Sequence, residues 1–156
     1  MTSIREFHAA THKRLAFLME HVASMPAELH TRALQGFGRP TIAKQFNHIL
    51  FCESAWVDAL KNRPERVWDH EESRLATLMG WRRDVADRTV VYLSELPADD
   101  LQKLLPAYPD QWVGVPRTPS FILHHILTHT FHHKGQIVAM CRILGHPAPD
   151  TDLQQG

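Results

Sequence analysis

The sequence predicts an all-α protein, in which four helices pack as a bundle in a single domain spanning residues 1–156. Four long stretches repeat apolar residues at three- and four-residue spacing, as the buried face of a helix requires. Turn and capping residues separate these stretches, and none shows the sustained two-residue alternation of a half-buried strand. A chain of 156 residues fits one domain and can bury a core without cross-links.

The first two helices have clear boundary signals. Ser3 and Glu6 have the spacing of a capping box, so the first helix is expected to begin there and to stop at residues 24–26. Residues 25–38 lack periodicity and contain two glycines, so we expect a loop. The second helix is expected over about residues 40–61, where Ile, Phe, Leu and Val recur on one face.

The third helix is expected over about residues 69–96, although Gly80 weakens its middle. Residues 97–117 follow as a proline-rich connector, and connectors of this length are often functional or wrap the fold. Tyr108 and Trp112 in this connector are expected to pack against the bundle, with the mouth of a cavity as the alternative.

The fourth helix is expected to begin at Thr118-Pro119 and to end at Gly145. Threonine is a favourable N-cap, and proline suits the first helical position because its missing N–H has no intrahelical partner there. Glycine commonly follows the last helical turn.

Composition excludes several classes of function. Lys+Arg and Asp+Glu both number 17, so the chain lacks the basic excess of a nucleic-acid-binding protein. No apolar run approaches the length that spans a bilayer, and the N-terminus lacks the apolar core of a signal peptide. The two cysteines do not make a disulfide framework, so we expect a cytoplasmic protein with free thiols and no membrane partner.

Histidine is over-represented, with 12 residues, and five of the ten residues from 124 to 133 are His. The surrounding residues are so apolar that this helix is expected inside the bundle. Residues four apart lie on one helix face, so His125, His129 and His133 form a stripe. Two imidazoles at this spacing can close on one metal ion, and we expect His129 and His133 to do so.

A third ligand has to come from another helix, and His48, among apolar neighbours on the second helix, is the best candidate. Three His with an open fourth position is typical of catalytic metal sites, and imidazole suits Zn²⁺ or Ni²⁺, with Fe or Mn as alternatives. His125 is expected to support a ligand, and Gln136 to orient an imidazole or a bound water. The alternative is that these interior His only hydrogen-bond to backbone carbonyls.

A rival pair, His8 and His12, has the same spacing on the first helix. Its neighbours are more polar, so we expect an exposed pair, although His12 could border the cavity. Cys52, one turn after His48, is expected to be a small buried hydrophobe, with a metal ligand as the alternative. Glu53 is expected to be solvated or to cap a neighbour. The GxSxG, P-loop, GxGxxG and HExxH patterns are absent.

The order and spacing of these residues resemble the DinB/YfiT-like superfamily over essentially the whole chain. The stretch from His125 to Gln136 is similar to the family pattern H-x-x-N-H-x-x-x-H-R-G-Q, and the stretch from Asn47 to Trp56 to N-H-L-L-x-x-D-x-x-W. The Pro-rich tail after Gly145 is similar as well. Thr128 stands where the family usually has Asn, and Lys134 where it has Arg.

The resemblance implies an up-down-down-up four-helix bundle, a homodimer, and a divalent metal held by His48, His129 and His133. It also implies an enzyme that uses the metal and a low-molecular-weight thiol, since the superfamily includes a maleylpyruvate isomerase and bacillithiol transferases. The thiolate would attack a small electrophile. Two alternatives stay open: a metal-dependent hydrolase, and a non-catalytic metal-binding stress-response dimer.

Overall fold

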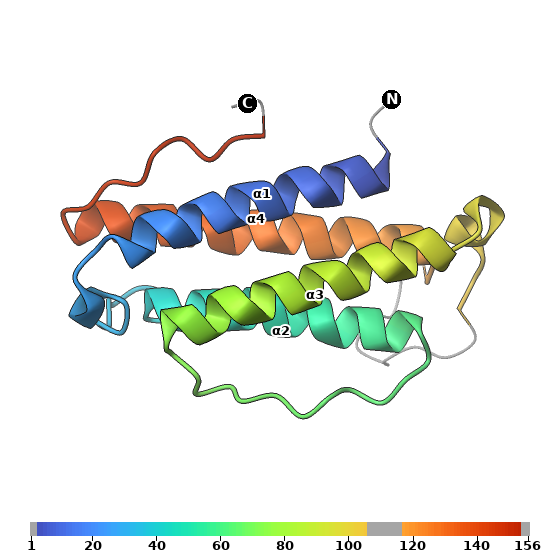
Figure 1. The fold of residues 1–156 in the computed structure, drawn as a ribbon, viewed down its shortest axis with the longest axis horizontal. Helices are drawn as coiled ribbons and strands as arrows, with labels where there is room; N and C mark the ends of the chain where they lie inside the picture. The colour runs from blue at the N-terminus through green and yellow to red at the C-terminus, as the bar shows by residue number, and fades with distance from the viewer. Residues whose placement is uncertain (1–2, 106–116, 154–156) are drawn as a thin grey trace.

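The computed structural model describes residues 3–105 and 117–153, and within them all regular structure is helical. Four long helices lie side by side (Figure 1): α1 (Ile4–Ala23), α2 (Ile42–Leu60), α3 (Leu75–Glu95) and α4 (Pro119–Ile143). Short 3-10 turns follow α1 and α3, namely η1 (Ala27–Leu29) and η2 (Ala98–Gln102). The predicted all-α, four-helix architecture is confirmed.

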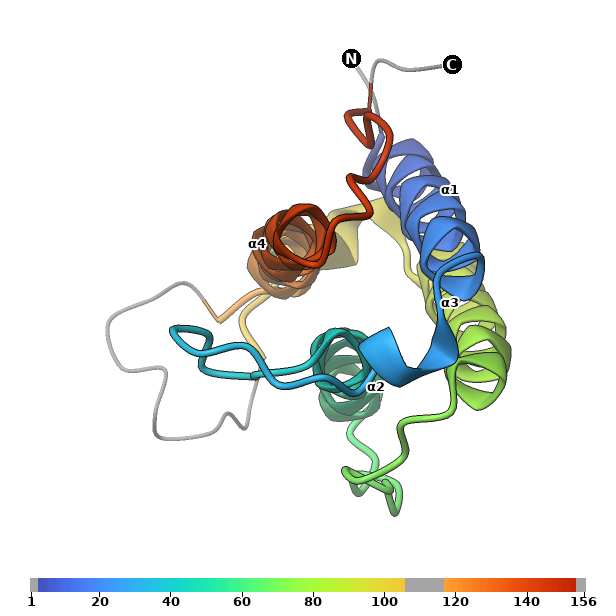
Figure 2. The ribbon, with the colours of Figure 1, turned by 90° about the vertical axis from the view of Figure 1, so that its left-hand side faces the viewer.

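Each helix packs against two of the other three. Helices α1 and α2 both contact α3 and α4, and Figure 2 shows the resulting arrangement along the bundle axis. The larger apolar core joins α1, α2, α3 and α4 around fully buried residues such as Leu18, Phe46 and Leu78. A smaller core around Ile122 and Val57 occupies the other end. Because α2 packs along α4, side chains from these two helices can meet in one site.

The capping signals of the sequence form as expected. The Ser3 hydroxyl accepts the Glu6 N–H at 3.2 Å, and the Ser3 N–H donates to the Glu6 carboxylate at 2.6 Å. The Thr118 hydroxyl accepts the N–H of Phe121, and Pro119 is the first residue of α4. Gly145 has a φ of +84°, the left-handed conformation that glycine adopts without strain.

The third helix begins at Leu75, not near residue 69 as predicted. Residues 61–74 instead form a long connection beside α2 and α3 (Figure 1). The amide of Asn47 on α2 donates to the carbonyls of Asp69 and Glu72, both at 2.9 Å. These contacts hold the connection extended, a tertiary effect that apolar periodicity does not report.

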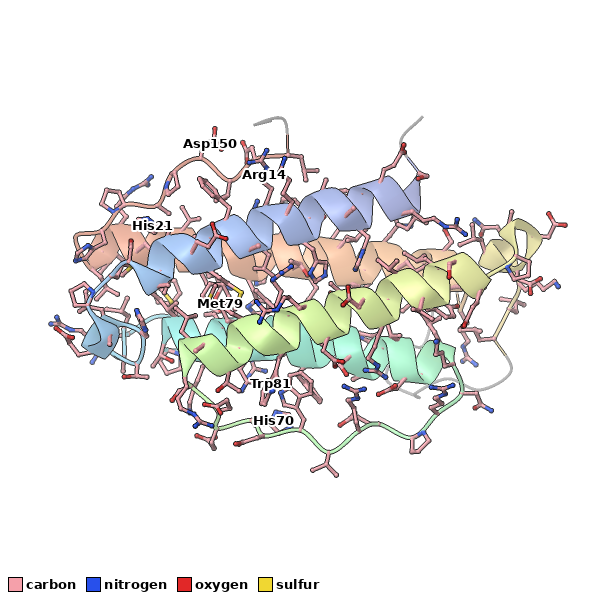
Figure 3. The ribbon with its side chains drawn as sticks, viewed as in Figure 1. Arg14, His21, His70, Met79, Trp81 and Asp150 are labelled. Carbon is pink, nitrogen blue, oxygen red and sulfur yellow. The ribbon has the colours of Figure 1, made fainter. Side chains whose placement is uncertain are left out.

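Aromatic packing also fixes this connection. The Trp68 ring lies 4.7 Å from the Trp81 ring of α3, measured between centroids, and its Nε1–H donates to the Asn47 Oδ1 at 2.8 Å. Figure 3 shows Trp81 and His70 on this side of the bundle. The connection therefore covers the outer side of α2 near the residues that precede His48.

The C-terminal tail crosses the outside of α1, where Figure 3 shows Asp150 near Arg14. The buried ammonium group of Lys134 on α4 donates to the Thr151 carbonyl and lies 4.0 Å from the Phe131 ring centroid. Lys134 therefore ties the tail to the bundle. Tyr108 and Trp112 lie outside the described residues. Among the described residues, no helix combines the length and apolar character needed to cross a membrane.

Candidate metal centre

Three imidazole rings meet between α2 and α4. The ring centroid of His48 lies 4.9 Å from that of His129 and 4.7 Å from that of His133. The centroids of His129 and His133, one turn apart on α4, are separated by 4.5 Å. The structure thus brings together the three residues that the sequence selected as ligands.

The environment keeps these imidazoles neutral. Burial, followed by the positive charge of Arg39 and of His133, lowers the pKa of His48 from 6.5 to about 4. Burial, followed by the neighbouring histidines, lowers the pKa of His129 to about 3. Burial, His132 and Arg39 lower that of His133 to about 4. At neutral pH each ring therefore carries a free lone pair, the form that binds metal ions.

A chain of amides orients His133. Its Nδ1 lies 2.6 Å from the Gln45 Oε1, and because the amide oxygen only accepts, Nδ1 carries the proton. The remaining lone pair is then on Nε2, and no hydrogen bond to it occurs among the described residues. Gln45 is itself held by the Arg39 carbonyl at 2.8 Å and the Gln136 Oε1 at 2.7 Å. This is how metal-binding histidines are usually oriented.

Gln45 was missed in the sequence analysis. Gln136, which was expected to orient an imidazole or a bound water, accepts a hydrogen bond from Gln45, and its Nε2 lies 2.8 Å from the Nε2 of His132, an imidazole that was not proposed as a ligand. The sequence did carry a signal for Gln45, a polar residue on an apolar helix three positions before His48. In the structure its side chain is fully buried. His125 lies farther along α4, with its ring centroid 5.7 Å from that of His129 and 5.9 Å from that of Trp56. His125 therefore stands beside the three-ring cluster.

Cys52 borders the same cluster. Its Sγ lies 3.6 Å from both ring nitrogens of His48. Potential ligand atoms of His48, Cys52 and His129 all lie within 4.8 Å of one another. Cys52 is half-buried, and burial raises the pKa of its thiol to about 11. The thiol is therefore protonated at neutral pH unless a cation binds beside it.

His8, His12 and Glu53 form a second group that could hold a metal ion, with potential ligand atoms within 4.8 Å of one another. The predictions of an exposed His8–His12 pair and a solvated Glu53 were wrong, because these side chains are only 3%, 5% and 1% exposed. The side chains of His8 and His12 on α1 reach Glu53 on α2 across the interior of the bundle, which their polar neighbours in the sequence did not indicate.

The second group is a hydrogen-bonded network. Both histidine Nε2 atoms lie 2.8 Å from Glu53 oxygens, and the Thr89 hydroxyl donates to the same carboxylate at 2.6 Å. Burial alone would raise the pKa of Glu53, but the charges and hydrogen bonds of His12 and His8 outweigh it and hold the pKa below its ordinary value. The Nε2 atoms that could bind a metal are thus already paired with an anion.

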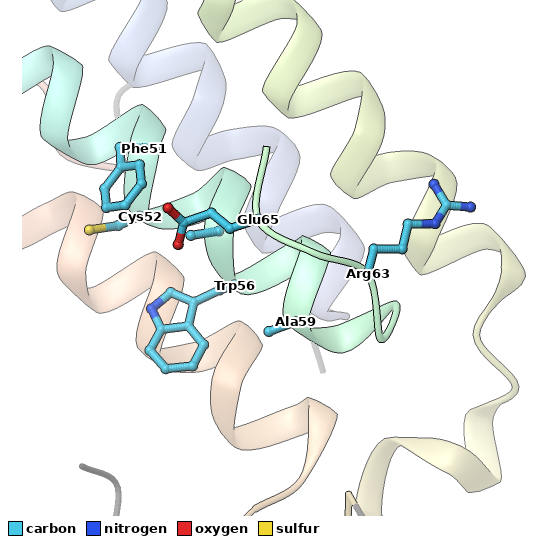
Figure 4. A pocket seen from close by; sticks show the side chains of 7 residues that line it. Phe51, Cys52, Trp56, Ala59, Arg63 and Glu65 are labelled. Carbon is cyan, nitrogen blue, oxygen red and sulfur yellow. The ribbon is translucent and has the colours of Figure 1, made fainter. Parts of the chain in front are cut away.

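Two cavities adjoin the three-ring cluster. The larger, of about 350 Å³, is lined by Phe51, Cys52, Ala55, Trp56, Ala59, Arg63 and Glu65. Figure 4 shows Cys52 and Trp56 extending from α2 toward α4, while Arg63 points away from them. The smaller, of about 180 Å³, has His48 in its wall together with Arg39, Lys44 and His70. A small molecule can therefore approach the cluster from the protein surface.

The model of the DinB family matches residues 6–155. The chain belongs to the DinB family. The match covers both the α2 segment with His48 and the α4 segment with His129 and His133, so the resemblance inferred from their motifs is confirmed. A search of curated proteins found no match to this DinB protein.

Proposed function

We propose that this DinB protein binds a divalent metal ion through His48, His129 and His133 and catalyses the reaction of a low-molecular-weight thiol with a small electrophile. The observation that carries the proposal is the convergence of three neutral imidazoles from two helices beside a cavity. The buried His8–His12–Glu53 group is a less suitable site, because its Nε2 atoms already contact a carboxylate.

The donor set fits a metal ion. With metal–nitrogen bonds of about 2.1 Å and near-tetrahedral angles, three bound imidazoles have ring centroids roughly 5 Å apart. The separations of 4.5, 4.7 and 4.9 Å are close to this value. Imidazole donors favour Zn²⁺ or Ni²⁺, with Fe²⁺ and Mn²⁺ as weaker candidates.

A bound metal ion would supply a positive charge that lowers the pKa of a coordinated thiol. The protein supplies binding and orientation. Gln45 holds the His133 ring, while Phe51 and Trp56 provide apolar walls that would exclude water from an electrophile. Arg39 and Lys44, in the wall of the smaller cavity, would favour a substrate that carries an anionic group near His48.

Metal analysis of tag-free protein tests the site. We expect about one metal ion per chain in the wild type and none in His129→Ala. His124→Ala is the matched control, because His124 is exposed on the same helix and bonds only the Ser120 carbonyl. Equal metal content in the wild type and His129→Ala would remove the proposed site. Loss of metal in His12→Ala with retention in His129→Ala would place the ion in the buried group.

Catalysis is tested separately with the metal-loaded protein, several thiols, and monochlorobimane or maleylpyruvate as the electrophile. We expect a rate above background that is absent in His129→Ala. No rate with any thiol would refute the transferase and isomerase activities while leaving metal binding intact. Turnover of an activated ester in place of the electrophile would favour the metal-dependent hydrolase.

The proximity of Cys52 to His48 supports a second candidate, a non-catalytic metal-binding stress-response dimer whose metal site is closed by the protein. This candidate predicts a bound metal without exchangeable water, which the relaxation of water protons by a paramagnetic ion measures. We also propose the homodimer and the up-down-down-up order of the helices, which the resemblance to the family implies. Light scattering on eluted protein gives the oligomeric state.

A further inference from the structure

The side-chain amide of Gln45 has only one orientation that satisfies its hydrogen bonds. It contacts the backbone carbonyl of Arg39 at 2.8 Å. A backbone carbonyl only accepts, so the group that meets it is the NH₂ group of the amide, and the amide oxygen faces the other way. Gln45 is fully buried, so water does not replace this partner. The Arg39 carbonyl therefore decides which end of the Gln45 amide reaches His133.

This orientation sets the direction of a chain of hydrogen bonds that runs from His133 to the surface of α4. The His133 Nδ1–H donates to the Gln45 Oε1 at 2.6 Å, and the Gln45 NH₂ group donates to the Gln136 Oε1 at 2.7 Å. The Gln136 NH₂ group then donates to the His132 Nε2 at 2.8 Å. His133 is buried and His132 is exposed, so the chain joins the three-ring cluster to the protein surface.

Gln136 is the second acceptor of the Gln45 NH₂ group. One N–H of this group meets the Arg39 carbonyl and the other meets the Gln136 Oε1, so both donors of the buried amide are paired. If the Gln45 amide turned over, its oxygen would face both of these oxygens and two hydrogen bonds would be lost. Its NH₂ group would then face His133, and the proton of that ring would have to move from Nδ1 to Nε2.

We infer that Gln136 is a positioning residue of the metal centre, which acts on His133 through Gln45. By accepting the second N–H of the amide, Gln136 keeps the His133 proton on Nδ1 and leaves the Nε2 lone pair for a cation. The inference rests on the proposed metal site and goes beyond its three ligands. The His133 tautomer, however, is a property of the metal-free protein and can be measured without the metal.

The same chain distinguishes two adjacent histidines of α4, whose ring centroids lie only 4.9 Å apart. The His132 Nε2 accepts the Gln136 N–H, so its lone pair is already used and its proton is on Nδ1. In His133 the proton on Nδ1 is bonded to Gln45, which leaves Nε2 as the nitrogen with a lone pair. The chain therefore selects His133, and not His132, as a metal ligand.

Two substitutions of Gln136 test the inference in metal-free, tag-free protein with isotopically labelled histidine. Gln136→Met removes the acceptor with little change in volume and leaves one buried N–H of Gln45 unpaired. Gln136→Glu keeps an acceptor for Gln45 and loses only the donor to His132. The nitrogen chemical shifts of His133, assigned by comparison with His133→Ala, report which ring nitrogen carries the proton. We expect Nδ1 in the wild type and in Gln136→Glu, and a mixture of Nδ1 and Nε2 in Gln136→Met.

The affinity for Zn²⁺, measured by chelator competition, should follow the tautomer. Gln136→Met should bind Zn²⁺ about ten-fold more weakly, at the lower end of what loss of an outer partner costs. Gln136→Glu should bind it at least as tightly as the wild type. Thr128→Ala is the matched control, because this exposed hydroxyl on α4 bonds only the carbonyls of His124 and His125, and its loss should change neither measurement.

A His133 proton that stays entirely on Nδ1 in Gln136→Met would overturn the role of Gln136. Equal losses of affinity in Gln136→Met and Gln136→Glu would also overturn it, because a general packing defect would then explain both. A wild type that binds no Zn²⁺ would instead remove the three-histidine site. In that case, the shift of the His133 proton in Gln136→Met would still support the action of Gln136 through Gln45.

Discussion

Replacing Glu53 by Gln tests whether the buried network stabilises the bundle. Its carboxylate accepts three hydrogen bonds, from His8, His12 and Thr89, at 2.8, 2.8 and 2.6 Å. Glutamine keeps one acceptor oxygen, and its NH₂ group then faces a histidine donor. One charged hydrogen bond is worth about 1.5–3 kcal/mol, and an unpaired buried donor costs about 1–3 kcal/mol. We therefore expect a loss of about 3–5 kcal/mol, as is typical of a broken buried ion pair.

Urea unfolding of the metal-free protein at pH 7, followed by circular dichroism, measures this loss. For a chain of this size, it corresponds to a decrease in Tm of roughly 10 °C. Glu95→Gln is the control, because Glu95 is 65% exposed, pairs only with Lys61 at 3.4 Å, and should change stability by less than about 0.5 kcal/mol. The metal content of the Glu53 variant should equal that of the wild type.

The pH dependence supplies a further check on Glu53. Its pKa in the folded protein is held below the ordinary value of 4.5, so its stabilising effect is complete above pH 4.5 and is lost as the pH falls below that value. The difference between wild type and variant should therefore be constant near neutral pH and shrink in acid. A difference below about 1 kcal/mol at pH 7 would refute the stabilising role of the three contacts.

Three other predictions address the metal centre and the helix ends. Gln45→Leu should weaken metal binding by about 10- to 100-fold, measured by chelator competition, because the His133 tautomer is no longer fixed; unchanged affinity would contradict this. Because the pKa values of His48, His129 and His133 are lowered in the folded protein, the unfolded chain binds more protons than the folded chain as the pH falls below 6.5. The metal-free protein should then lose up to about 1.4 kcal/mol per pH unit for each histidine down to about pH 4, and equal urea midpoints at pH 7 and pH 5 would refute the shifts. Thr118→Ala should lower the free energy of unfolding, measured in urea, by about 1 kcal/mol, and an unchanged free energy would show that the N-cap is dispensable.

Local chemistry explains why much of the fold could be predicted from the sequence. The caps at Ser3 and Thr118 involve residues three positions apart, and apolar periodicity is a property of one helix at a time. The pairing of His129 with His133 also follows from the geometry of a single helix. His48 was identified because it lies on another apolar helix and matches the family motif.

Features that depend on how helices face one another could not be predicted. The extended connection before α3 depends on Asn47, which bonds backbone groups more than twenty residues away. The burial of His8, His12 and Glu53 depends on α1 and α2 facing each other across the interior of the bundle, and Gln45 meets His133 across 88 positions of sequence.

The sequence by itself therefore determined the four helices, most of their ends and the candidate metal ligands, because these depend mainly on neighbours within a turn or two. Only the tertiary structure decided which polar groups became buried and which partners they met. The physical reason is that the free energy of a buried polar group depends on the partner it meets, and in this bundle that partner usually lies on another helix.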